Sequence, residues 1–229
     1  MRLIHLASVT LMAASLAAVE TSRNDLRLMV GMVPAYEVQE DSTPAAGGAT
    51  SGYDWQGTDI SALAIGVQYL VDVGKPRESG RPVIGAEVLI HSASLKPETY
   101  ASGGSTLSNV DGEQFSYVAI SPALVLGWRF AQPENNRLGL LGELQAVAGV
   151  TLLTGQIDNQ YGTDTSFGYG VDGGVRALLG LQEAGWTGNV SVGVRRGWAT
   201  ISMDQDTKTS DLTLDAMGVE VLVSAGYLF

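Results

Sequence analysis

The sequence contains no cysteine, so no disulfide can hold its fold together. Charge is sparse, at 16% of 229 residues, and basic residues are the scarcer kind, with 13 Lys and Arg against 24 Asp and Glu. The formal net charge of −11 argues against a nucleic-acid partner, because phosphates require a basic face. Beyond the first residues there is no apolar run of the ~20 residues that a membrane-spanning helix needs. The absences therefore point away from a disulfide-stapled domain, a nucleic-acid-binding protein and a helical membrane protein.

The first residues carry an export pattern. Arg2 precedes an apolar run that ends at Ala17, and Ser15 and Ala17 provide small side chains at the cleavage spacing. The run of roughly 15 residues is too short to anchor the chain in a bilayer, which takes ~20. The pattern predicts a secretory signal peptide over residues 1–17, which leaves residues 18–229 as one domain.

The rest of the chain alternates between apolar and polar residues with a period of two, in a sequence rich in glycine (29 residues). Each alternating segment is at least as long as the 9 to 11 residues of a tilted transmembrane strand. The eight segments cover residues 25–38, 59–73, 83–95, 115–130, 137–153, 166–181, 187–201 and 212–229. Long or acidic connections (39–58, 96–114, 154–165 and 202–211) take turns with generally shorter ones (74–82, 131–136 and 182–186). This layout predicts an all-β, eight-stranded antiparallel up-and-down transmembrane β-barrel with both termini in the periplasm.

Alternation alone fits two structures, a soluble barrel with the apolar face inside or a membrane barrel with that face towards lipid. The export pattern and a polar face without lysine favour lipid, since a soluble exterior normally carries interspersed Lys and Glu. Aromatic residues near the ends of the apolar face give the third indication. They predict one girdle at Trp128, Phe130, Trp186, Tyr227 and Phe229, and an outer one at Tyr36, Phe167, Tyr169 and Trp198.

The opposite face of the strands places ionisable side chains in the lumen. The residues expected there are Arg27, Glu37, Asp72, Glu87, His91, Arg129, Glu143, Asp172, Arg176, Arg195 and Glu220. Ions in a narrow lumen must pair, because desolvating each costs several kcal/mol. Counting along the strands predicts two ionic layers, one with Glu87, Glu143 and Arg176, and one with His91, Asp172, Arg195 and Glu220.

The final strand alternates from Val219 to Phe229, which is the last residue of the sequence. A strand that ends on an aromatic residue resembles the assembly signal of bacterial outer-membrane barrels, which implies the barrel-assembly machinery as a partner. With its strand layout and charged interior, the chain resembles the small eight-stranded outer-membrane barrels, the group that includes the OmpA transmembrane domain and OmpX. The resemblance implies an outer-membrane location in contact with lipid and lipopolysaccharide, a plugged lumen, and a role in envelope integrity, adhesion or surface recognition.

Catalytic and metal-binding residues are not expected. After signal removal only His91 remains as a histidine, and the inward residue two positions on is Ala93, so a Ser–His pair on one face is missing. The acidic segment with Asp204, Asp206 and Asp211 lacks the glycine and the final glutamate of a calcium-binding loop. The sequence therefore predicts a structural or surface-interaction protein without enzyme activity or cofactor. A small pore is the alternative, and a soluble exported carrier of lipocalin type is a third.

Overall fold

The computed structural model describes residues 23–44, 51–55, 61–73, 80–96, 99–102, 105–108, 114–131, 138–159, 162–204 and 208–229. The predicted signal peptide, residues 1–17, lies outside these ranges. Among the described residues, no helix is long and apolar enough to cross a membrane.

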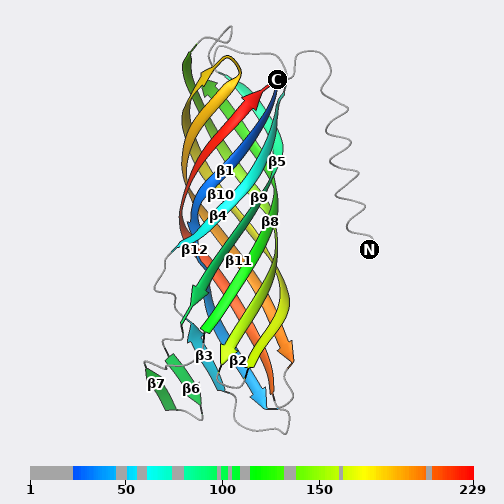
Figure 1. Ribbon diagram of the computed structural model, residues 1–229, viewed down its shortest axis with the longest axis vertical. Helices are drawn as coiled ribbons and strands as arrows, with labels where there is room; N and C mark the ends of the chain where they lie inside the picture. Colours follow the sequence, from blue (N-terminus) through cyan, green and yellow to red (C-terminus); the bar gives the residue numbers. More distant parts are fainter. Residues whose placement is uncertain are drawn as a thin grey trace, which may run out of the picture.

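Eight long antiparallel strands form a closed ring, drawn in Figure 1 as a tall barrel. They follow one another around the ring in sequence order, and the pairing of the last strand with the first closes it. The strands are β1 (Asn24–Pro34), β4 (Ser61–Asp72), β5 (Arg81–Leu95), β8 (Gln114–Ala131), β9 (Gly139–Asn159), β10 (Gly162–Glu183), β11 (Trp186–Asp204) and β12 (Lys208–Leu228). The predicted all-β, eight-stranded up-and-down barrel is confirmed.

Four short strands extend the sheet beyond the ring, at the end opposite the carboxy-terminus (Figure 1). They are β2 (Glu37–Pro44), β3 (Ser51–Trp55), β6 (Thr99–Ser102) and β7 (Ser105–Ser108), and they continue from β12 in that order. We call these four strands the extension. The prediction of plain connections over residues 39–58 and 96–114 was therefore wrong. Strand pairing needs only backbone groups, and Ser- and Thr-rich segments supply them without an apolar alternation to reveal the strand.

Two further predicted connections also turn out to be largely strand. The predicted 154–165 connection is occupied by β9 up to Asn159 and by β10 from Gly162, and β11 and β12 likewise extend into 202–211. Within the β9–β10 hairpin, Thr163 donates a hydrogen bond to Asp158 over 2.6 Å. That bond, together with those from Gln156, lowers the pKa of the Asp158 carboxyl.

At the other end of the ring the β10–β11 connection is very short. Glu183 pairs directly with Trp186, which leaves Ala184 and Gly185 as a two-residue turn with φ values of 49° and 87°. Positive φ at both central residues matches the right-handed twist of the flanking strands, and glycine adopts it without steric cost.

The first predicted strand, 25–38, is broken. The register shifts by one residue between the pairs Met32–Val221 and Glu37–Asp215. Over this stretch β12 contains one residue more than the β1–β2 segment opposite it. The shift reverses which side chains face inward, because successive residues of a strand alternate between faces. Tyr36 is therefore 2% exposed inside the barrel, and Glu37 faces outward. The predictions of Tyr36 in the outer girdle and Glu37 in the lumen were both wrong.

The exterior of the ring is apolar along its strands. Leu28 is 68% exposed and Leu140 is 71% exposed, and similar residues occupy the outward positions of all eight strands. Soluble proteins rarely expose contiguous apolar surface of this extent, whereas lipid requires it. The barrel is thus of the membrane-embedded, outer-membrane type. The soluble-carrier alternative fails because it would place this aliphatic face inside.

Aromatic side chains lie at both ends of the apolar exterior. Phe130, Phe167, Tyr169, Trp186, Trp198, Tyr227 and Phe229 are exposed, and Trp128 is half-buried. Trp186 and Tyr227 lie in register on β11 and β12, with their ring centroids 5.2 Å apart.

Candidate functional site

The end of the lumen nearest the carboxy-terminus holds a buried ionic cluster. Arg27 lies 2.6 Å from Glu143 and 2.5 Å from Asp25. Arg129 contacts three carboxylates, with Nε 2.5 Å from Glu143, Nη2 2.8 Å from Asp25 and Nη1 2.9 Å from Asp72. All five side chains are almost completely buried, so each charge depends on its partners for compensation.

Two members of this cluster were not predicted. Asp25 shares the inward parity of Arg27 on β1, which is a signal that could have identified it. Arg81 begins β5, and its Nη1 lies 2.8 Å from Asp72. Because it stands at a strand end, alternation does not mark it clearly.

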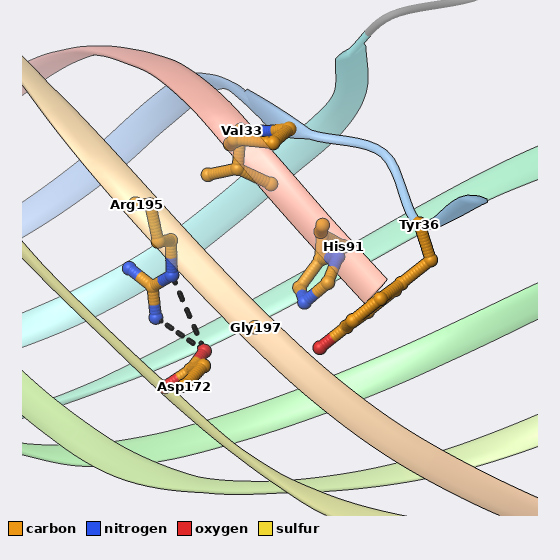
Figure 2. Close-up of a pocket in the computed structure, with 8 residues that line it drawn as sticks. Val33, Tyr36, His91, Asp172, Arg195 and Gly197 are labelled. Atoms are coloured by element: carbon orange, nitrogen blue, oxygen red, sulfur yellow. Dashed lines mark hydrogen bonds and ion pairs between the residues drawn. The ribbon is translucent and has the colours of Figure 1, made fainter. Parts of the chain in front are cut away.

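A second ionic cluster follows towards the middle of the barrel. Arg176 is ion-paired with Glu87 and lies 3.2 Å from Glu220. Arg195 lies 2.7 Å from Asp172 and 3.0 Å from Glu220, with Glu87 at 3.5 Å. Figure 2 shows the two hydrogen bonds between Arg195 and Asp172 as dashed lines.

Two buried amides join the clusters into one network. Gln68 donates to Glu87 over 3.1 Å and to Gln145 over 3.2 Å, and Gln145 donates to Glu143 over 2.7 Å. Arg176 in turn donates to Gln145 over 2.9 Å. Because both amides use donors and acceptors, they satisfy carboxylates on one side and guanidinium groups on the other.

The membership of the two layers differs from the prediction. Glu87 and Arg176 lie with Asp172, Arg195 and Glu220, whereas Glu143 lies with Arg27 and Arg129. Strand tilt and stagger cause the difference, since residues at equal counts along tilted strands stand at different heights in a barrel.

Beyond the ionic clusters lies a small polar group around His91. Ser121 Oγ is 3.5 Å from His91 Nε2 and 3.0 Å from Thr151 Oγ1, and all three residues are buried. The prediction that a Ser–His pair is missing considered one strand only, and it was wrong, because Ser121 comes from the neighbouring strand β8. The cavity beside His91 leaves only about 10 Å³ open to the centre of a water molecule, and Ser121 does not line it. The pair is therefore enclosed within the lumen.

The interior turns apolar towards the extension. Its buried cluster consists of Tyr36, Val38, Leu95, Phe115, Tyr117, Ala119, Leu153, Ile157, Ala199, Ile201, Met203, Leu212, Leu214 and Ala216. At the same level the outward residues of β2 and β12 are polar, as with Glu37, Asp211 and Asp215. Along β2 and β12 the polarity therefore inverts, to polar outside and apolar inside, whereas Val118, Leu152 and Trp198 remain apolar and exposed beside the same cluster. Of these residues, Ile157 and Met203 fall in segments predicted as connections and Tyr36 was predicted in the outer girdle, whereas the others of the cluster lie in predicted strands.

This arrangement fills the lumen with side chains whose opposite charges pair with one another. Arg27, Arg129, Tyr117 and Phe115 are among the largest fully buried side chains. No group of three or more His, Cys, Asp or Glu residues within the described part of the chain could hold a metal ion. Asp206 lies outside the described residues, as does the side chain of Asp204. Chemically, the lumen is a closed ion-pair network capped by an apolar core.

Comparison with known proteins finds similar shapes but no relative by sequence. No family model and no curated protein matches the chain. Among solved structures, Ail, the attachment invasion locus protein of Yersinia pestis, is similar with 10% identity and a TM-score of 0.38, over 90% of this chain and 99% of Ail. The outer membrane protease OmpT from Escherichia coli is similar with 8% identity and a TM-score of 0.43, over 92% of this chain and 98% of OmpT. The fold assignment itself rests on strand pairing and on the exposure pattern of this chain.

Proposed function

We propose that this protein is a non-conducting outer-membrane barrel with a structural or surface-interaction role. Its barrel anchors the extension at the cell surface. The observation that carries the proposal is the filled lumen, in which the buried arginines and carboxylates pair and an apolar cluster follows. Envelope integrity and adhesion are the roles that such an anchor and such a surface support.

The pore alternative is weaker on two counts. An eight-stranded ring is just wide enough for side chains to fill it, whereas porins with water-filled channels use 16 to 18 strands. An ion-selective path also needs fixed charges that face water. Here Arg27, Arg129, Arg176 and Arg195 are all 5% exposed or less, and each is already paired with carboxylates.

A catalytic role has no support from the described residues. The Ser121–His91 pair is enclosed, and the paired acids of the lumen are neutralised by arginines. We therefore include the absence of enzyme activity in the proposal.

Electrical recording tests the proposal directly. The purified barrel, verified by heat-dependent gel mobility, is inserted into a planar lipid bilayer. We expect no steady conductance, because the network and the apolar cluster leave no continuous water path. Stable, ion-selective current steps from the unmodified protein would show that the pore alternative is correct.

A further inference from the structure

A small cavity lies between the second ionic cluster and the polar group around His91 (Figure 2). In this view Arg195 and Asp172 stand on one side, His91 and Tyr36 on the other, and Gly197 between them. The volume open to the centre of a water molecule is about 10 Å³. That is close to the smallest space that holds one water, and it is too small for an organic ligand.

Two residues that line this cavity carry buried polar atoms with no hydrogen-bond partner among the described residues. They are Nδ1 of His91 and Oδ1 of Asp172. Arg195 donates twice to Asp172, but both bonds go to Oδ2. A buried acceptor without a donor loses its hydration free energy with nothing in return, so native structures nearly always supply a partner.

The Ser121 and Thr151 hydroxyls can each donate or accept a hydrogen bond, so they are compatible with a proton on Nε2 of His91. Nε2 lies 3.5 Å from Ser121 Oγ, whose other neighbour is Thr151 Oγ1 at 3.0 Å. A proton on Nε2 lets His91 donate to Ser121 and lets Ser121 donate to Thr151. Nδ1 is then a lone-pair acceptor, like the Asp172 oxygen.

His91 and Asp172 both line this water-sized cavity, and with Nε2 of His91 protonated each carries an unpartnered acceptor atom. We propose that the cavity binds a single water molecule that donates to His91 Nδ1 and to Asp172 Oδ1. The water completes a hydrogen-bonded chain from Asp172 through His91 and Ser121 to Thr151, which links β10, β5, β8 and β9 across the lumen. It lies where the ionic network ends and the apolar cluster begins.

Nitrogen NMR tests the assignment, because the sequence has only two histidines, His5 and His91. The full chain with His5→Gln is labelled with ¹⁵N-histidine and placed in phosphatidylcholine vesicles at neutral pH. We expect a protonated Nε2, an unprotonated Nδ1, and magnetisation transfer from a long-lived water to the ring. A proton on Nδ1, or a ring without contact to water, would overturn the proposal.

Filling the cavity supplies the matched comparison. A Cβ at Gly197 would stand 2.8 Å from the Tyr36 hydroxyl, so Gly197→Ala takes space at the cavity. A Cβ at Gly188 meets nothing within 4 Å, which makes Gly188→Ala the control. We expect the water contact to disappear in Gly197→Ala and to persist in Gly188→Ala. Should Gly197→Ala fail to insert, Ala216→Val narrows the same cavity, and a water signal that survives it would refute the site.

Discussion

Two neighbouring arginines on β11 show that the contribution of a charged side chain to stability depends on which face of the strand it occupies. Arg195 points into the lumen and contacts Asp172, Glu87 and Glu220. Arg196 points outward, with its side chain 69% exposed and Asp215 at 3.5 Å. A solvent-exposed ion pair adds little to the free energy of unfolding, whereas removing one partner of a buried pair lowers it strongly.

Replacing each arginine measures this difference. We expect Arg195→Ala to lower the free energy of unfolding by roughly 3 to 5 kcal/mol, because it leaves buried carboxylates uncompensated. Arg196→Ala serves as the control, with a change of no more than about 1 kcal/mol in either direction. Denaturant titration of the barrel in lipid vesicles gives both values. Equal effects of the two substitutions would mean that Arg195 is hydrated and the lumen is not sealed.

Leu124 tests the lipid-facing side in the same way. It is 56% exposed near the middle of β8, between Ala86 and Ala148 on the adjacent strands. We expect Leu124→Arg to destabilise the inserted barrel by roughly 2 to 4 kcal/mol, as for a cation at the bilayer midplane. Gln39→Arg, on the exposed polar face of β2, is the control and should change stability little. A Leu124→Arg barrel as stable as the unmodified one would contradict the membrane assignment of this face.

Residue parity also shows how far sequence reasoning reaches into the lumen. Arg27, Asp72, Arg129 and Glu143 could be placed inside because each lies in a long alternating run. Contacts between strands could not be derived, because they depend on stagger, so the amide bridge at Gln145 and the Ser121 contact to His91 emerged only from the three-dimensional arrangement.

At the level of strands, alternation located all eight members of the ring but not their ends. The β1–β2 break is the clearest failure, because Pro34 and Val33 are both buried and the inward parity changes there. The hydrophobic pattern of residues 25–38 cannot show that β12 has one residue more than the β1–β2 segment opposite it. The extension was missed for another reason, since its strands are polar and short.

The last strand permits a test of the proposed assembly signal. Phe229 is 61% exposed, and its backbone exchanges two hydrogen bonds of 2.9 Å with Asn24. We expect Phe229→Ala to reduce the amount of barrel assembled in the outer membrane, because the substitution removes the aromatic side chain and keeps those bonds. Phe167→Ala, which removes an 81% exposed aromatic from β10, is the control. Equal outer-membrane yields for the two variants would argue against a special role of the final aromatic residue.

At the level of the whole molecule, the inversion of polarity implies an orientation in the membrane. The ring presents hydrocarbon to lipid, while β2 of the extension presents Glu37, Gln39 and Asp41 outward. The short Ala184–Gly185 turn and the carboxy-terminus lie at the opposite end (Figure 1). We therefore expect the extension at the cell surface and the turn in the periplasm.

The lack of cysteine makes this orientation simple to measure. Gln39→Cys places a thiol on the exposed face of β2, and Glu183→Cys places one beside the turn. We expect a membrane-impermeant maleimide to label Gln39→Cys on intact cells and Glu183→Cys only after the cells are broken. The reverse pattern would require the barrel to be inserted the other way round.

The pairing of β1 with β12 sets the order in which the molecule can form. Each other pair of neighbours in the ring joins strands that are consecutive among the eight, although β2 and β3 lie between β1 and β4, and β6 and β7 lie between β5 and β8. The β1–β12 pairing, from Asn24 and Phe229 to Met32 and Val221, joins the two ends of the described chain, and the β12–β2 pairing continues it. Closing such a loop costs configurational entropy before any contact repays it, and pairings of high sequence separation form slowly. Until the ring closes, β1 and β12 each keep an open strand edge with which another chain can pair.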